Sequence, residues 1–514
     1  MSKFLRGTII LLAAGFVTRV LGFINRIVIA RSLGETGVGL HQMAFPTLML
    51  VITVTQLGLP VAISKCIAEA DAVGDRAKIK KILVISLTVT ISLSAVFTPG
   101  LILLAPYLAD HLFTDPRVYY PLAAITPIIP IVAVSAVLRG YFQGKQNMKP
   151  YAVSQVIEQS VRIMLIAFFA NLLLPYGIAY AAAGVMFASI LGELSSLLYM
   201  FTMFKLKKQI RVRKHFFKAV KSGKDTFYEL MRVAVPTVWS RLIGNLSWFL
   251  EPIVVSHCLA LAGVASHLAT KQYGSLTGFA MPLLMLPSFV TVSLSTALVP
   301  AISEANSRKN ARLVEHRLQQ ALRFSLLTGG ISVVILYVFA EPLMQAMYGT
   351  ANGSQFIKIM APFFIFQACQ APLQAALQAM DLAKAAMINS IIGAVVKLGT
   401  IFVLASRPEF GINGAAIGIM AGMVLVTFLH FATVLKKIQF TLYVHDWAKL
   451  LAVSVVSGAV GHWWFTGMMA QDASFLRLLA GICLTVAVYT LLLIMTKLIR
   501  RSDLMYIPIL KKWL

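Results

Sequence analysis

The stretch that decides the fold is Thr18–Gly34, TRVLGFINRIVIARSLG, which lies in the first long apolar run of the chain. Arg19 and Arg26 are seven residues apart, so on a helix they share one face with Gly22 between them. An arginine at bilayer depth costs about 3 to 15 kcal/mol, depending on the reference state. Such a side chain normally faces protein or a water-filled cavity, although Arg26 could also reach the membrane interface. We therefore predict a polar cavity beside this helix.

The composition around this stretch is that of a polytopic membrane protein. The 514 residues are 59% hydrophobic and 12% charged, with a mean hydropathy of +0.82, whereas soluble proteins carry about 25% charged residues. Apolar segments of about 20 residues recur along the chain. The first of them is too long for a signal peptide, contains Arg19 and lacks a small-residue cleavage pattern, so we predict an uncleaved first helix.

Fourteen membrane spans are predicted, and the even count places both termini on one side of the membrane. These spans are 8–30, 40–63, 82–106, 121–138, 152–174, 178–203, 233–256, 272–302, 324–340, 356–380, 386–405, 412–435, 450–468 and 478–496. Of the 45 Lys and Arg residues, 34 fall in loops on the side of the termini and 5 in the opposite loops. This asymmetry predicts that both termini are cytoplasmic.

The same charge pattern accounts for the net charge of +26 without a nucleic-acid partner. The densest basic run, Lys205–Lys224, is expected to lie beside anionic lipid head groups. The cysteines are scattered and offer no metal-binding spacing or evident disulfide pair, so we interpret them as apolar fillers. They are Cys66, Cys258, Cys369 and Cys483.

An internal repeat divides the chain. Four motifs recur in the same order: Thr18–Gly22 with Ser240–Gly244, Leu59–Ser64 with Val299–Ser303, Gln143 and Arg162 with Gln378 and Lys397, and Gly177–Gly184 with Gly411–Gly418. They predict two six-helix lobes at 1–225 and 226–440, followed by 441–514 with the last two spans and a cytoplasmic tail. Six helices is an even number, so the lobes share their orientation and are related by an axis along the membrane normal. Substrate sites in such transporters lie near the midplane between the lobes.

Charges inside the predicted spans are mostly basic. The basic ones are Arg19, Arg26, Arg162, Arg241, Lys271 and Lys397, and the acidic ones are Glu158, Glu193 and Glu251. Arg19 with Arg241, and Arg162 with Lys397, occupy equivalent places in the two repeats. A cavity lined by paired cations suits a phosphate or pyrophosphate, because arginine binds such groups with two parallel hydrogen bonds.

One helix face in the seventh span carries a polar and aromatic stripe. Arg241, Asn245, Trp248 and Pro252 follow the helical spacing i, i+4, i+7 and i+11. This stripe indicates either a cavity wall with an aromatic anchor or buried packing around a proline kink. Glu251 stands beside the kink and is a candidate for ion coupling.

The other candidate for ion coupling is Glu158 in the fifth span. Glu158 and Arg162 are four residues apart, a spacing that equally predicts a local ion pair. Helix interruptions are predicted at Gly58–Pro60, Pro127–Pro130, Pro282–Pro287 and Pro300, where a bundle can move or line a cavity.

Motifs of energy-coupled or catalytic chemistry are absent from the sequence. No G-x-x-x-x-G-K-[ST] phosphate loop, H-E-x-x-H motif or nucleophile–base constellation occurs. We therefore predict a transporter and not an enzyme, with no catalytic residue, metal or cofactor. The driving force would be a gradient or the membrane potential, which is worth about 2.3 kcal/mol per charge at 100 mV.

Several segments of the sequence are similar to those of a known family. They are 58–70 (GLPVAISKCIAEA), 138–159, 240–255 (SRLIGNLSWFLEPIVV), 270–284 and 286–303. Through them the chain resembles the stage V sporulation protein B family of the multidrug/oligosaccharidyl-lipid/polysaccharide exporter superfamily, and Arg19–Phe23 (RVLGF) also resembles the lipid II flippases.

This resemblance implies an all-α protein with fourteen helices, in two six-helix lobes plus a C-terminal pair whose groove holds a lipid tail. It implies a flippase in the bacterial cell membrane for an undecaprenyl-pyrophosphate-linked saccharide, a lipid II-type peptidoglycan precursor used in the spore cortex. Arg19 matches the functional first-helix arginine of the flippases. The implied partners are this lipid-linked anionic oligosaccharide, membrane lipids and cell-wall synthesis enzymes. The alternatives are a cation-coupled multidrug exporter of the same fold and a non-transporting scaffold for cell-wall enzymes.

Overall fold

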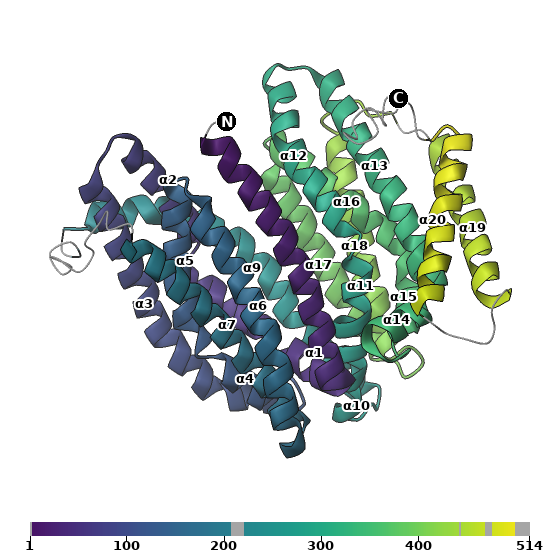
Figure 1. The fold of residues 1–514 in the computed structure, drawn as a ribbon, viewed down its shortest axis with the longest axis horizontal. Helices are drawn as coiled ribbons and strands as arrows, with labels where there is room; N and C mark the ends of the chain where they lie inside the picture. Colours follow the sequence, from purple (N-terminus) through teal and green to yellow (C-terminus); the bar gives the residue numbers. More distant parts are fainter. Residues whose placement is uncertain (1–2, 207–219, 221, 442–443, 468–474, 499–514) are drawn as a thin grey trace. The chain divides into compact units, whose positions relative to one another are not determined.

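The computed structural model describes residues 3–206, 220, 222–441, 444–467 and 475–498. This part of the chain is helical and contains no β-strand (Figure 1), which confirms the predicted all-α class. Most of the basic run at 205–224, and the tail from residue 499, lie outside the described residues.

The helices pack into two compact units. Unit 1 comprises Met1–Gly278 and Ser406–Ile412, and unit 2 comprises Phe279–Ala405 and Asn413–Leu514. The predicted repeat boundaries at 225 and 440 are a property of the sequence and stay a prediction. The first 53 residues of the predicted second lobe, 226–278, nevertheless pack as part of unit 1.

The helices of unit 1 carry most of the candidate site. They are α1 (Lys3–Gln56), α2 (Leu59–Ala72), α3 (Arg76–Tyr107), η1 (Leu108–Leu112), η2 (Pro116–Val118), α4 (Tyr119–Ile125), α5 (Ile128–Gly144), α6 (Met148–Leu173), η3 (Leu174–Tyr176), α7 (Ile178–Leu206), α9 (Lys224–Leu261) and α10 (Ser266–Gly274). The short segment η4 (Ser275–Ala280) follows α10.

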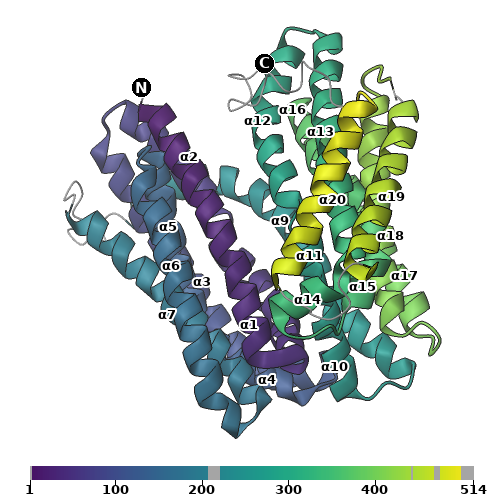
Figure 2. The same ribbon diagram turned by 45° about the vertical axis from the view of Figure 1, so that its right-hand side comes forward.

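The helices of unit 2 include the last two predicted spans, which follow the two predicted six-helix lobes. They are α11 (Met281–Met285), α12 (Ser288–Ser307), α13 (Ala311–Val338), α14 (Ala340–Tyr348), α15 (Ser354–Met360), η5 (Ala361–Phe363), α16 (Phe364–Ala379), α17 (Ala383–Ala405), α18 (Ile412–Leu435), α19 (Val444–Gly467) and α20 (Phe475–Met495). Figure 2 shows α19 and α20 side by side, and the Tyr489 hydroxyl of α20 donates a hydrogen bond to the Leu327 carbonyl of α13 at 2.9 Å.

Twelve helices of the described residues are long and apolar enough to cross a membrane, or thirteen if the bent pair α4–α5 is one span. The predicted count of fourteen is therefore not confirmed. The main difference is that the first two predicted spans belong to one helical element of 59 residues, Ala14–Ala72.

Gly34 bends this first element. A straight helix as long as α1, 54 residues, would extend about 80 Å, far beyond a bilayer core of about 30 Å. Gly34 breaks the helix with φ 61° and ψ −174°, a conformation that a side chain would oppose. The chain thereby turns back, as the purple ribbon in Figure 1 shows.

Three of the four predicted helix interruptions are confirmed. Leu57 and Gly58 adopt positive φ between α1 and α2, α4 and α5 meet at an angle of 40°, and α11 ends just before Pro287. The prediction at Pro300 is wrong, because this proline lies inside α12. Helices in a membrane tolerate an internal proline where neighbouring groups satisfy the freed backbone carbonyl.

Two glycines let α10 lie directly on the backbone of α1. A Cβ atom at Gly39 would be 2.0 Å from the Thr270 carbonyl oxygen, and one at Gly274 would be 2.1 Å from the Glu35 carbonyl oxygen. Neither position has room for a methyl group. The contact fixes where α10 sits along α1 and brings the Lys271 ammonium of α10 to 3.8 Å from the Glu35 carboxylate of α1.

We predict that Gly274→Ala lowers the stability of the protein by about 1–3 kcal/mol, because the new methyl group meets backbone atoms that cannot rotate away. Gly399→Ala in α17 is the matched control, since nothing lies within 4 Å of its Cβ position. The measurement is the thermal unfolding midpoint of the purified protein in detergent. Equal midpoints for both variants would contradict the close approach of α10 to α1.

Candidate functional site

Four charged side chains form a buried ion-pair network in unit 1. Arg139 of α5 donates a hydrogen bond from Nη2 to Oε1 of Glu193 of α7 at 2.5 Å. The same Nη2 lies 3.6 Å from Oε2 of Glu158 of α6. Arg162, one turn further along α6, donates from Nη2 to Glu158 Oε1 at 2.5 Å. Two positive and two negative charges therefore compensate each other.

Close packing of α6 and α7 positions this network. A Cβ atom at Gly192 would be 3.0 Å from the Glu158 carbonyl oxygen and 3.1 Å from the Arg162 Cβ. The absence of a side chain at Gly192 lets α7 approach α6, and its neighbour Glu193 is then within reach of Arg139. Only 5% of the Glu193 side chain and 12% of the Glu158 side chain are exposed.

Arg139 is the member of this network that the sequence analysis missed. The predicted fourth span ends at 138, which assigns Arg139 to a loop, but α5 continues to Gly144. The available indication was local: the fifth and sixth spans contain two carboxylates, Glu158 and Glu193, but only one basic residue, Arg162. The structure shows the local Glu158–Arg162 ion pair, and ion coupling by Glu158 stays a prediction.

We predict that Arg139→Ala costs about 3 kcal/mol of stability, because it leaves the two carboxylates with one buried arginine. Arg308→Ala is the matched control, since Arg308 pairs with Glu304 on the surface with 71% of its side chain exposed, and such pairs contribute under about 1 kcal/mol. Chemical or thermal unfolding in detergent measures the difference. A cost for Arg139→Ala no larger than that of the control would refute the network.

The predicted stripe of α9 contacts the part of α1 that follows Gly34. Asn245 donates a hydrogen bond from Nδ2 to the Thr53 hydroxyl at 2.6 Å. The Trp248 and Phe45 rings meet edge to face, with centroids 5.8 Å apart, and Trp248 remains 38% exposed. Arg241, on the same face of α9, is exposed. The stripe therefore combines packing against α1 with an open, charged end.

Three of the predicted basic residues also lie in unit 1. Arg19 is half-buried and Arg26 exposed on α1. Arg26 and Arg162 both act electrostatically on His41, which is buried in α1 and stacks on Phe45 with ring centroids 5.6 Å apart. The structure thus brings Arg26, Arg162 and the α9 stripe to one region formed by α1, α6 and α9.

The two remaining predicted residues lie elsewhere. Lys397 is in α17 of unit 2, where a Cβ atom at Gly422 of α18 would be 2.6 Å from the Lys397 Cβ. Glu251 of α9 is buried with 8% of the residue exposed, and Tyr273 of α10 forms a hydrogen bond with it. The site roles of both residues stay predictions.

Hydrogen bonds of Asp115 link α10 to the loop before α4. Its carboxylate accepts two hydrogen bonds from the Arg117 guanidinium, at 3.0 and 2.8 Å, and one from the Thr270 hydroxyl at 2.6 Å. The Ser266 hydroxyl donates to the Thr114 carbonyl at 2.6 Å. Burial alone would raise the pKa of Asp115, but the bonds from Arg117 and Thr270 outweigh it and hold this pKa below its ordinary value.

We predict that the hydrogen bonds of the Asp115 carboxylate with Arg117 and Thr270 weaken in acid. In the unfolded chain the pKa of Asp115 is about 4. Because folding lowers this pKa, the ionised carboxylate adds to the free energy of unfolding at pH values above about 4, and this stabilisation is lost as the pH falls through the lower pKa of the folded state. Asp115→Asn should therefore lower the thermal unfolding midpoint at pH 7 and flatten its fall between pH 7 and pH 3. The exposed Asp110→Asn variant should follow the wild type. A pH profile of Asp115→Asn that overlays the wild type would contradict the assignment.

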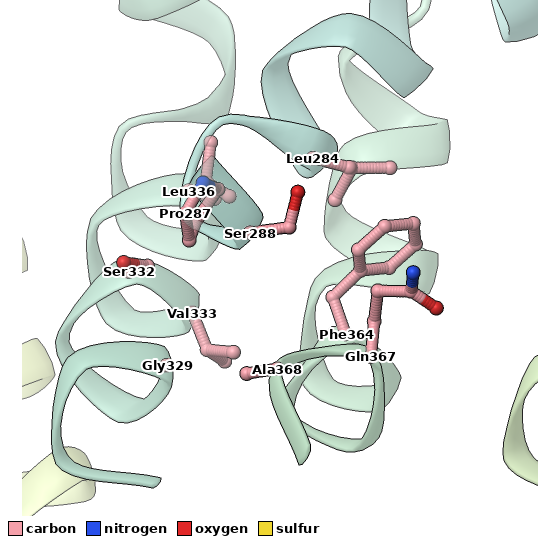
Figure 3. A pocket seen from close by; sticks show the side chains of 10 residues that line it. All are labelled: Leu284, Pro287, Ser288, Gly329, Ser332, Val333, Leu336, Phe364, Gln367 and Ala368. Carbon is pink, nitrogen blue, oxygen red and sulfur yellow. The ribbon is translucent and has the colours of Figure 1, made fainter. Parts of the chain in front are cut away.

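Two cavities of the described residues are candidate binding sites. The first, in unit 2, lies beside the Pro287 helix break (Figure 3). The Ser288 hydroxyl in its wall donates a hydrogen bond to the Met285 carbonyl at 2.6 Å, and no charged side chain lines this cavity, so it does not suit an anion. The second is an open depression of about 760 Å³ at the Gly34 bend. Arg117 and Lys271 line it, but Asp115 and Glu35 neutralise them, the latter pair at 3.8 Å.

Sequence comparisons identify relatives over the whole chain. A family model described as a polysaccharide biosynthesis protein matches residues 4–306, and the MatE model matches residues 252–403. Stage V sporulation protein B of Bacillus subtilis (strain 168) is 57% identical over 512 residues, which are 99% of this chain and 98% of the relative. The lipid II flippase MurJ of the same organism is 26% identical over 418 residues, covering 77% of this chain and 76% of the relative.

Solved structures share the fold. The lipid II flippase MurJ in an inward closed conformation matches with a TM-score of 0.69 and 18% identity, covering 96% of this chain and 100% of that chain. An inward-facing multidrug resistance transporter of the MATE family matches with a TM-score of 0.66 and 16% identity, covering 82% of this chain and 96% of that chain.

The chain is a multi-span membrane protein with the fold of the solved MurJ and MATE-family structures. It belongs to the stage V sporulation protein B family.

Proposed function

We propose that the protein is a flippase that moves an undecaprenyl-pyrophosphate-linked saccharide across the cell membrane, with both termini in the cytoplasm. The observation that carries this proposal is the contrast between two sets of arginines in unit 1. Arg139 and Arg162 are paired with the carboxylates of Glu193 and Glu158, whereas Arg241 is exposed within α9, a helix long and apolar enough to cross a membrane. In a membrane, an exposed charge of this kind requires a polar partner, because lipid cannot solvate it.

A pyrophosphate is a suitable partner for the basic residues of α1 and α9. Arg19, Arg26 and Arg241 would donate charge-assisted hydrogen bonds to its oxygens, in pairs where the guanidinium fork matches two oxygens. Asn245, bound to Thr53, and the half-exposed Trp248, supported by Phe45, would contact the neighbouring saccharide. Arg162 and Lys397 remain further candidates for electrostatic attraction of the anion.

The precursor proposed as substrate is a lipid II-type molecule for spore cortex peptidoglycan. The support is a relative named for sporulation that is 57% identical, together with a relative named as a lipid II flippase. Enzymes that consume the flipped precursor are proposed as partners. The membrane potential would drive an anion outward, since each charge crossing 100 mV gains about 2.3 kcal/mol.

A second candidate function is cation-coupled multidrug export. The MatE model matches residues 252–403, and Glu251 is a buried carboxylate of the kind that couples proton or sodium movement. Dye efflux from a reporter strain separates the candidates, because an exporter of cationic drugs lowers dye accumulation and a flippase of a lipid-linked anion leaves it unchanged.

We predict that the double variant Arg19→Ala/Arg241→Ala loses flipping activity by at least about 100-fold, since each hydrogen bond to a charged group contributes about 1.5–3 kcal/mol. The assay measures outward movement of labelled lipid II in vesicles that contain the purified protein, with and without a membrane potential. Arg232→Ala is the matched control, because Arg232 is also exposed on α9 but lies two and a half turns before Arg241. Full activity of the double variant would refute the proposal.

A further inference from the structure

Three metal-ligating side chains of unit 1 meet away from the candidate substrate site. Cys66 and Glu69 lie one turn apart on α2, and Glu229 lies on the first part of α9. The Cys66 Sγ and one carboxylate oxygen of each glutamate all lie within 4.8 Å of one another. The sequence analysis interpreted Cys66 as an apolar filler because the third ligand comes from a helix far along the chain.

The Cys66 thiol is the central group of this cluster. The residue is 1% exposed and belongs to a buried apolar cluster that includes Ile63, Ile67 and Leu230. Among the described residues, no hydrogen bond to its sulfur occurs, and the sulfur faces the two carboxylates. A buried polar atom without a partner that faces two anionic groups is well placed to receive a cation.

We propose that Cys66, Glu69 and Glu229 bind a thiophilic divalent cation such as Zn²⁺, with water as a fourth ligand. In tetrahedral zinc sites the sulfur lies about 2.3 Å and the carboxylate oxygens about 2.0–2.2 Å from the ion. The Cys66 sulfur and the two carboxylate oxygens would therefore have to move closer to one another by up to roughly 1 Å. The side chain of Glu69 is 54% exposed and free to rotate by that amount. Calcium and magnesium fit poorly, because they require six or more oxygen ligands.

Two lysines complete the surroundings of the cluster. Lys78 of α3 donates a hydrogen bond to Oε1 of Glu229 at 2.9 Å, and Lys65 lies 4.0 Å from Oε1 of Glu69. Lys78 bonds to one oxygen of Glu229, so the other oxygen can bind a metal ion. Its hydrogen bond also orients the carboxylate, a role that residues bonded to a metal ligand commonly have. The lysines also compensate the two carboxylates when the thiol is protonated, which makes the metal-free state stable.

The bound ion would join α2 to α9 beside the helix break at Leu57 and Gly58. α2 begins directly after this break, and a Cβ atom at Gly58 would be 2.7 Å from the Ala234 carbonyl oxygen of α9. The ion would therefore stabilise the contact between α2 and α9, and the unfolding midpoint measures this effect.

The test uses the purified full-length protein in detergent and Co²⁺ as a spectroscopic substitute for Zn²⁺. The wild type should bind one Co²⁺ with a thiolate-to-cobalt charge-transfer band, and Zn²⁺ should displace it. Cys66→Ser and Cys66→Ala should both lose the band, and Glu229→Gln should weaken Co²⁺ binding by at least about tenfold, since even the loss of an outer partner of a ligand costs that much. Cys369→Ser is the matched control, because Cys369 is also buried but lies in unit 2, outside the cluster.

The outcome separates metal binding from a folding defect. Equal unfolding midpoints for the wild type and Cys66→Ala in the absence of metal, together with a rise on Zn²⁺ addition in the wild type alone, would support the site. Absence of the charge-transfer band in the wild type, or the same band in Cys66→Ala, would overturn it. This test is independent of the proposed substrate, because it measures the metal alone.

Discussion

The interaction on which unit 1 depends is the compensation of charge in an apolar medium. Arg139 bridges the carboxylates of α6 and α7, and Arg162 completes the network from α6. Removing any one of these partners would leave a mostly buried charge uncompensated. The network therefore links α5, α6 and α7, and α6 packs against α1.

The basic residues of α1 and α9 are more accessible than this network. Arg26 and Arg241 are exposed and Arg19 is half-buried, and the proposal assigns these three residues to an anionic substrate. Asn245 and Trp248 give this face a fixed geometry, because each contacts α1 through one side. Backbone contacts at Gly39 and Gly274 and the Asp115 cluster then fix α10 to α1.

Local patterns in the sequence predicted the features that depend on neighbouring residues. Hydropathy gave the all-α class, the Gly58 and Pro127 interruptions follow from backbone preferences, and the Glu158–Arg162 pair follows from helical spacing. The sequence did not reveal that Arg139 belongs to the same network, because its partners lie on α6 and α7. Pro300 was wrongly predicted to break a helix, since tertiary packing determines whether a proline is tolerated. The cluster of Cys66 with Glu229 likewise depends on the contact between α2 and α9.

The central claim is that Arg19 and Arg241 face water and an anionic ligand, and not lipid. Its most direct test is cysteine accessibility, with single cysteines at positions 19 and 241 in a protein whose four native cysteines are replaced. The account predicts that a membrane-impermeant, charged thiol reagent labels both positions and that a pyrophosphate-linked lipid protects them. Labelling only by a lipid-soluble reagent, with no protection by the pyrophosphate-linked lipid, would contradict it.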